Sequence, residues 1–239
     1  MNKRTSLQHI AAAILSGLLL AAAFPKLDQT WLLIFALVPL LWALRGQSLK
    51  AAFWLGLASG LAHYVALLYW IVYVTNVFGK LPLILAIGIL LLLAGYLCLY
   101  RAVWGLGVAW GAARGLSLLW WAPVLWVALE MGQTYIISGF PWDPLGNGLY
   151  RHPVLLQLAD ITGVYGLSFL VVLVNVSLYL LCFPPRGQAF KFRQAAAVCL
   201  ILALWIGYGF YRLEEMAALT AASPKIKRPG SQDRGRVCV

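Results

Sequence analysis

Hydrophobic residues in this chain fall into seven long runs that are separated by short polar stretches. The runs extend from Leu7 to Phe24, Trp31 to Leu44, Ala51 to Phe78, Leu81 to Ala113, Leu118 to Ile137, Ile161 to Phe183 and Ala195 to Tyr211. About 20 apolar residues in a helix cross the roughly 30 Å hydrocarbon core of a bilayer. The pattern therefore predicts an all-α membrane protein, a polytopic bundle of about seven transmembrane helices.

The fourth run, Leu81 to Ala113, does not have the length of an ordinary span. It is too long for one straight crossing and too short for two crossings of about 17 residues joined by a turn. A helix that tilts, or that is broken at a glycine, accommodates such a length. We therefore expect one crossing here and an odd total.

Composition supports a membrane protein and excludes an ordinary soluble domain. The 239 residues are 63% hydrophobic and 10% charged, and the mean hydropathy is +0.85. Soluble domains carry about 25% charged residues. The four cysteines lack paired spacing and the three histidines are scattered, so we predict neither a metal site nor a cofactor.

The net charge of +11 reflects membrane topology and not a nucleic-acid surface. One set of loops carries Lys3, Arg4, Arg45, Lys50, Arg114, Arg186, Lys191 and Arg193. The opposite loops carry only Lys26, Lys80 and Arg151. By the positive-inside rule, the N-terminus lies in the cytoplasm and the segment after the seventh helix lies outside. No basic stripe interleaved with aromatic residues remains for a nucleic acid.

The first run allows a second interpretation. Residues 1–23 have a basic start, an apolar centre and the small residues Ala21, Ala22 and Ala23, as a secretory signal peptide does. Near-bilayer length and six further runs favour a retained helix. Cleavage after Ala23 would leave the orientation of the remaining helices unchanged.

Two ionisable residues lie deep inside the predicted helices, Arg101 in the fourth run and Glu130 in the fifth. At 1.5 Å per residue, each lies about 18 Å from the cytoplasmic end of its helix. A charge at the centre of an isolated span costs about 2.5 to 3.5 kcal/mol, so such residues pair or carry a function. We predict an Arg101–Glu130 ion pair, which either clamps two helices or lines a substrate path, with Glu130 the better functional candidate.

The stretch SGFPWDPLGNG, from Ser138 to Gly148, joins the fifth and sixth runs. Two prolines fix φ and remove backbone donors, while three glycines permit turns that other residues resist. These residues predict a short, defined loop on the outer face that holds aromatic rings at the membrane interface. The candidate lipid or substrate residues of this loop are Gly139, Phe140, Pro141 and Trp142. The alternative is an ordinary interfacial turn with one tryptophan.

Other small residues indicate helix packing and not chemistry. The pairs Gly56–Gly60 and Gly107–Gly111 have the G-x-x-x-G spacing that brings helix backbones together. Ser168 has only half of a G-x-S-x-G nucleophile motif, because Leu170 replaces the second glycine. We interpret Ser168 as a packing residue and predict no catalytic residue.

The string GFPWDPLGNG, together with the run ADITGVYGLSFLVVLVN from Ala159 to Asn175, resembles the membrane domain of the bacterial apolipoprotein N-acyltransferases. FPK at Phe24 to Lys26, VPLLWAL in the second run and LLYW at Leu67 to Trp70 also resemble early helices of that family. The resemblance covers about residues 7–227.

This resemblance implies an enzyme of the bacterial inner membrane that matures lipoproteins. The family transfers an acyl chain from phospholipid, through an enzyme cysteine thioester, to the N-terminal Cys of a diacylated lipoprotein. Its partners are therefore phospholipid and lipoprotein precursor. Its catalytic Glu, Lys and Cys belong to a nitrilase-like domain that follows seven helices.

The end of the chain departs from the family pattern. Where the first strand of the nitrilase-like domain is expected, the chain reads RPGSQDRGRVCV. We expect a membrane domain at residues 1–215 and a disordered polar tail at 216–239, as in a truncated or frameshifted acyltransferase that is inactive alone. Asn147 also replaces a family aromatic. The alternative is a non-catalytic membrane protein that binds lipid or a partner chain.

Overall fold

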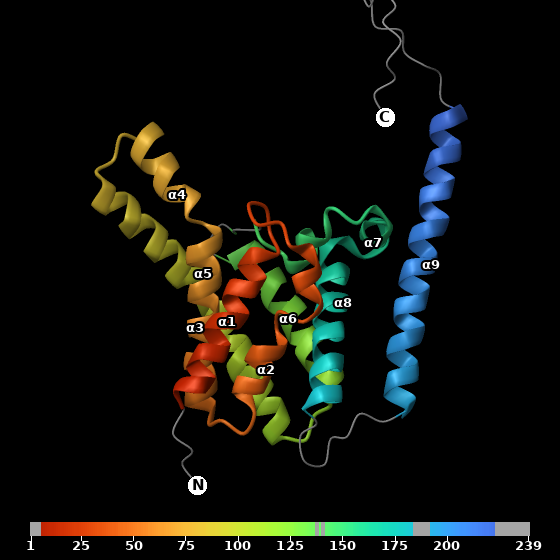
Figure 1. Ribbon diagram of the computed structural model, residues 1–239, viewed down its shortest axis with the longest axis horizontal. Helices are drawn as coiled ribbons and strands as arrows, with labels where there is room; N and C mark the ends of the chain where they lie inside the picture. The colour runs from red at the N-terminus through yellow and green to blue at the C-terminus, as the bar shows by residue number, and fades with distance from the viewer. Residues whose placement is uncertain (1–5, 137–138, 140–141, 184–191, 223–239) are drawn as a thin grey trace, which may run out of the picture.

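The computed structural model describes residues 6–136, 139, 142–183 and 192–222. Within these residues the chain is helical and contains no β-strand, which confirms the all-α prediction. The helices are α1 (Leu7–Ala22), η1 (Thr30–Ile34), α2 (Val38–Leu44), α3 (Leu49–Leu67), α4 (Trp70–Tyr73), η2 (Val74–Phe78), α5 (Leu83–Ala113), α6 (Leu118–Tyr135), η4 (Leu145–Leu149), α7 (Pro153–Leu156), α8 (Ala159–Cys182) and α9 (Phe192–Ala222). Helices α1, α2, α3, α6 and α8 lie side by side as a bundle, beside which α9 stands at one edge (Figure 1).

Each predicted hydrophobic run corresponds to one helix or to two or three consecutive helices. Three helices, α5, α8 and α9, are long and apolar enough to cross a membrane, and α3 with the bent segment after it would make a fourth. Helices α1 and η1–α2 are apolar but shorter. The structure thus supports a membrane protein by helix length and composition.

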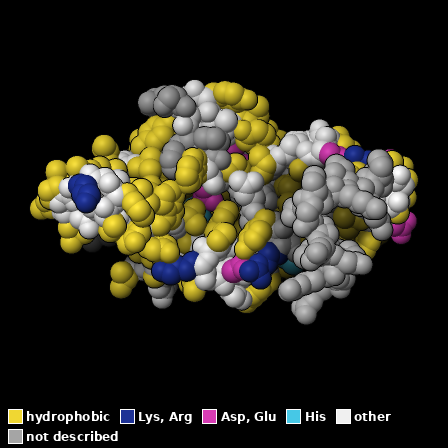
Figure 2. Space-filling view, turned by 90° about the horizontal axis from the view of Figure 1, so that it is seen from above, with side chains coloured by type: hydrophobic (Ala, Val, Ile, Leu, Met, Phe, Trp, Pro, Cys, Tyr) yellow, Lys and Arg dark blue, Asp and Glu magenta, His cyan; other side chains and the backbone are white. Residues whose placement is uncertain are grey.

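Helix α5 accounts for the long fourth run without a break at a glycine. Its 31 residues form one continuous helix, which at 1.5 Å per residue is about 46 Å long. The N-terminal part of α5 extends away from the bundle beside α4, and the two together form an arm (Figure 1). Hydrophobic side chains make up much of the surface of this arm in the view from above, and a basic side chain lies at its end (Figure 2).

Glycines bring α3 and α5 close together, as the G-x-x-x-G spacing predicts. A Cβ at Gly60 would lie 2.9 Å from the Cβ atoms of Arg101 and Cys98. A Cβ at Gly56 would lie 3.0 Å from the Cα of Ala102. Because backbone atoms cannot move aside as side-chain ends can, these contacts require glycine.

Tryptophan side chains join α5 to α6. The indole N–H of Trp121 donates to the carbonyl of Gly107 at 2.8 Å, and that of Trp104 donates to the carbonyl of Ala122 at 3.0 Å. Each bond gives an indole N–H an acceptor that water does not supply inside an apolar bundle. The second glycine pair thus serves packing against α6, because Trp121 also covers Gly111.

The second hydrophobic run is interrupted, and a single asparagine of α8 compensates for the interruption. Between η1 and α2 the backbone leaves the helical hydrogen-bond pattern. The buried Asn175 accepts from the N–H of Leu37 at 2.8 Å and donates to the carbonyl of Leu33 at 2.6 Å. Ser16 of α1 donates to the carbonyl of Ala36 at 2.7 Å. Non-helical backbone at membrane depth requires such partners.

Polar contacts tie two loops together at the end of the bundle where α7 lies. Asp28 pairs with Arg151 and accepts from the hydroxyl of Tyr150. Thr30 and the imidazole of His152 are 2.8 Å apart and share a hydrogen bond. The loop before η1 and the loop after η4 therefore hold each other in place.

The last described helix ends later than the expected domain boundary. Helix α9 continues to Ala222, so residues 216–222 are helical rather than part of a disordered tail. Residues 223–239 lie outside the described residues. The low-charge segment MAALTAA contains good helix formers, which explains why the helix extends past Glu215.

The contact of α3 with α5 makes a testable prediction about Gly105. A Cβ at this position would lie 2.8 Å from the carbonyl oxygen of Ala52 and 3.3 Å from the Cα of Gly56. We expect Gly105→Leu to destabilise the protein by about 3 kcal/mol or more, because overpacking against backbone forces the helices apart. A fluorescence-detected thermal unfolding curve of the purified protein measures the loss.

The matched control is Gly88→Leu in the same helix, where no atom lies within 4 Å of an added Cβ. Leucine favours helix over glycine by up to about 1 kcal/mol, so this variant should be as stable as the parent or slightly more stable. Equal stability of the two variants would contradict the close packing of α3 on α5.

Candidate functional site

The loop between α6 and η4 is the most distinctive feature of the sequence, and the structure describes it in part. Gly139 has a φ of +72°, a conformation that favours glycine, as the predicted turn requires. Phe140 and Pro141, two of the predicted site residues, lie outside the described residues. Trp142 follows them and is 62% exposed.

A buried hydrogen bond anchors the loop directly after Trp142. The Asp143 carboxylate lies 2.6 Å from the Nε2 atom of His63 in α3, and both side chains are almost completely buried. An aspartate pulled into an apolar bundle loses its hydration, so it needs a partner of this kind. His63 is thus a structural partner of the loop and not one of three scattered histidines.

Two further side chains hold the next two backbone amides. The N–H of Leu145 donates to the Oε1 atom of Glu130 at 2.7 Å, and the N–H of Gly146 donates to the hydroxyl of Ser168 at 2.9 Å. These amides open the short 3-10 helix η4, where an initial N–H has no partner within the helix. Glu130 and Ser168 take the place of the missing carbonyls.

Close packing explains two glycines of the loop that were expected to form turns. Gly146 and Gly148 lie within η4 and do not have positive φ. A Cβ at Gly146 would lie 2.7 Å from the Cβ of Leu167, and one at Gly148 would lie 2.7 Å from a methyl group of Leu33. The loop therefore packs tightly between η1 and α8.

The exposed ring of Trp142 stacks on Trp70, the first residue of α4. The two ring centres are 5.3 Å apart and the ring planes differ by 21°. Offset stacking of two indoles contributes about 0.5 to 1.5 kcal/mol beyond the area it covers. The contact connects the loop to the base of the arm.

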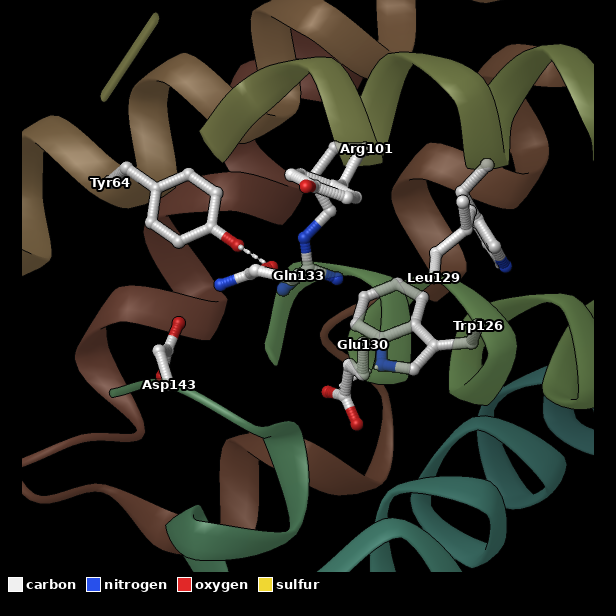
Figure 3. A pocket seen from close by; sticks show the side chains of 9 residues that line it. Tyr64, Arg101, Trp126, Leu129, Glu130, Gln133 and Asp143 are labelled. Atoms are coloured by element: carbon white, nitrogen blue, oxygen red, sulfur yellow. Dashed lines mark hydrogen bonds between the residues drawn. The ribbon is translucent and has the colours of Figure 1, made fainter. Parts of the chain in front are cut away.

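Below the loop, a small cavity brings together Arg101 and Glu130, the two charged residues predicted to pair. Its walls are Tyr64, Tyr100, Arg101, Trp104, Trp126, Leu129, Glu130, Gln133 and Asp143. Figure 3 shows these side chains converging from α3, α5, α6 and the loop. The prediction that Arg101 and Glu130 lie at one level of the bundle thus agrees with the structure.

The two charged groups do not form the predicted direct ion pair among the described residues. Instead the guanidinium of Arg101 lies over the ring of Trp126, 3.6 Å from its centre. The indole N–H of Trp126 donates to Glu130 at 2.8 Å. Trp126 therefore stands between the charges, because the rotation of each helix decides which side chains meet and depth alone does not.

Sequence reasoning missed His63, Asp143, Trp126 and Ser168 as parts of this site. Their signal was weak, because each is a single polar or aromatic residue within or between hydrophobic runs, with no spacing that pairs it with another. Asp143 offered the best signal, since it is an acidic residue between two prolines in a loop of otherwise uncharged residues. Only folding shows that three helices converge on this loop.

The fold and the site define an all-helical membrane domain that braces an aromatic loop at one end of the bundle. Residues 16–177 match the profile of the apolipoprotein N-acyltransferase N-terminal domain. The chain belongs to the apolipoprotein N-acyltransferase family.

Several relatives carry the name apolipoprotein N-acyltransferase. The protein of Geobacter metallireducens is 45% identical over 204 residues, which cover 84% of this chain and 39% of that protein. The protein of Shewanella oneidensis is 32% identical over 192 residues, which cover 79% of this chain and 37% of that protein. The protein of Chromobacterium violaceum is 29% identical over 202 residues, which cover 82% of this chain and 38% of that protein. The chain thus spans about two fifths of the length of these relatives.

The anchoring role of Ser168 can be tested by Ser168→Ala. The buried N–H of Gly146 would lose its acceptor, which costs about 1 to 3 kcal/mol. Amide hydrogen exchange in the peptide that contains residues 142–150 should speed up by about tenfold or more, since 1.4 kcal/mol corresponds to tenfold. Mass spectrometry of the purified protein measures the rate.

Ser177→Ala in the same helix is the matched control. The hydroxyl of Ser177 is also buried, but it donates to the carbonyl of Leu173 within its own helix. Its loss leaves no amide of the loop without a partner, so exchange in residues 142–150 should not change. Identical exchange in the two variants would show that Ser168 does not hold the loop.

Proposed function

We propose that this chain is the membrane part of an apolipoprotein N-acyltransferase and that its Gly139–Gly148 loop binds phospholipid at the outer rim of the bundle. The observation that carries the proposal is the bracing of an exposed tryptophan. Trp142 is 62% exposed, while the residue after it is 4% exposed and paired in the core. An aromatic ring that stays largely exposed although it stacks on Trp70, and that stands on so firm a base, is suited to bind a ligand.

The physical chemistry of the loop fits a lipid ligand. Indole rings favour the interfacial depth of a bilayer, where headgroups meet acyl chains. Three anchors hold the backbone after Trp142, so little conformational entropy is lost when a lipid binds. Glu130 contributes by holding the amide of Leu145, which places it behind the loop and not in contact with lipid.

We place the bundle in the inner membrane of a bacterium with seven crossings. The crossings are α1, η1–α2, α3 with its bent extension, α5, α6, α8 and α9. The bias of Lys and Arg puts the N-terminus in the cytoplasm and the end of α9 outside. The loop and Trp142 then face the periplasm, where lipoprotein precursor meets phospholipid.

In this proposal the chain supplies the lipid-holding scaffold for acyl transfer from phospholipid to the N-terminal Cys of a lipoprotein. The reaction needs a thiolate with a nearby base and an oxyanion partner. We assign none of these roles to a residue of the bundle, in keeping with the position of the Cys98 thiol, which donates to the carbonyl of Gly95 in its own helix.

Phospholipid binding predicts a specific effect of Trp142→Ala. Loss of the ring should weaken binding by about 1 kcal/mol, roughly fivefold, because one interfacial aromatic contact is removed. Crosslinking of the detergent-purified protein by a photoactivatable phosphatidylethanolamine, titrated to half-saturation, measures the change.

Trp31→Ala is the control, since Trp31 is 56% exposed but contacts Gln29 and Phe35 in its own segment rather than the loop. Its removal should leave the half-saturation point near that of the parent. If both variants bind phospholipid as tightly as the parent protein does, the loop has no role in lipid binding. The family membership would still stand.

The proposed topology predicts the activity of reporter fusions. Alkaline phosphatase fused after Glu215 should be active, because this enzyme folds only in the periplasm, and a fusion after Arg186 should be inactive. Green fluorescent protein fused at the same positions should give the opposite pattern. Reversed activities would overturn both the orientation and the placement of the loop on the outer face.

A further inference from the structure

Four buried polar atoms around the base of the loop have no hydrogen-bond partner within the described protein. They are Nδ1 of His63, Nη1 of Arg101, Oε2 of Glu130 and Oδ1 of Asp143. Buried polar atoms in folded proteins nearly always have partners, because an unsatisfied group in an apolar interior costs about 1 to 3 kcal/mol and more when charged. Four such atoms close to one another indicate that a ligand binds there.

Three of these atoms belong to the walls of one cavity. Arg101, Glu130 and Asp143 line the cavity below the loop, together with Tyr64, Trp126 and Gln133. Arg101 and Asp143 are only 6% and 4% exposed, so bulk solvent does not satisfy them. In Figure 3 the guanidinium of Arg101 points between Tyr64 and Trp126 toward the space that Asp143 and Glu130 border.

The size of the cavity limits what it can hold. Its free volume is about 20 Å³, and a cavity needs about 10 to 15 Å³ on this measure to hold one water molecule. A phosphate, a lipid headgroup or an acyl chain is much too large. A bare cation would have to sit beside the guanidinium of Arg101, which repels it.

The charges around the cavity match a molecule that both accepts and donates hydrogen bonds. Nη1 of Arg101 is a donor, whereas Oδ1 of Asp143 and Oε2 of Glu130 are acceptors. A water oxygen can accept from the guanidinium, and its two hydrogens can go to carboxylate oxygens.

We propose that the cavity is a binding site for one internal water molecule, which accepts from Arg101 and donates to the carboxylates of Asp143 and Glu130. The water links α5, α6 and the loop, whereas the predicted direct Arg101–Glu130 ion pair would have joined α5 to α6 alone. It belongs to the scaffold itself, so it does not depend on whether the loop binds phospholipid.

Radiolytic labelling of the whole protein in lipid nanodiscs tests this site. X-rays convert a bound water into a hydroxyl radical that attacks the nearest side chain, so a buried residue beside an internal water is oxidised. Trp126 lines the cavity and is 2% exposed, while Trp205 does not line this cavity and is 7% exposed. The indole N–H of each donates to one acceptor, so the two tryptophans form a matched pair.

We expect Trp126 to be oxidised several-fold faster than Trp205, with heavy oxygen incorporated when the sample is equilibrated in ¹⁸O water. Oxidation of Trp126 at or below the rate of Trp205 would overturn the proposal. Because Trp205 is the more exposed residue, leakage of bulk solvent would favour it and cannot produce the expected result.

Leu129→Phe provides a second measurement, since Leu129 lines the cavity and a larger side chain fills it. In this variant the oxidation of Trp126 should fall to the level of Trp205, while the rate at Trp205 itself stays constant and reports an intact fold. If Trp205 keeps its rate and Trp126 also stays fast, the cavity does not hold the water. If the variant does not fold, the comparison of the two tryptophans in the parent protein decides.

Discussion

Backbone amides and carbonyls that leave the helix pattern inside an apolar bundle need polar partners, and the rest of this structure depends on how they obtain them. Water is scarce at membrane depth, so side chains of neighbouring helices must supply the hydrogen bonds. Asn175 does so for the break between η1 and α2. Glu130 and Ser168 do so for the first amides of η4. Polar residues within the hydrophobic runs are therefore structural partners of the irregular segments.

This arrangement braces the loop at one end of the bundle. The core of the bundle holds the loop at Asp143, Leu145 and Gly146. The only described side chain between Gly139 and Asp143 is that of Trp142, and it points outward onto Trp70. In the function proposed above, a loop braced in this way would meet lipid in a constant geometry and contribute through shape rather than through reacting groups.

The sequence predicted the helices well and the contacts at the site poorly, for a physical reason. The limits of a helix in a membrane follow from the length of an apolar run, as for α5 and α8, whose bounds differ from the predicted runs by two residues or fewer. Contacts depend on the rotation of each helix about its axis. Trp126 lies one turn before Glu130 in α6, so a modest rotation decides whether Arg101 meets the carboxylate or the indole ring.

By itself, the sequence determined that the protein is helical and membrane-embedded, which family it resembles, and where close helix packing occurs, because these properties depend on local composition and on short spacings. The tertiary structure alone decided that His63, Glu130 and Ser168, which belong to three different helices, converge on one loop. Hydrogen bonds between distant segments produce no recurring spacing of residues that could be recognised in a sequence. They exist only once packing has brought a donor and an acceptor together where no water competes.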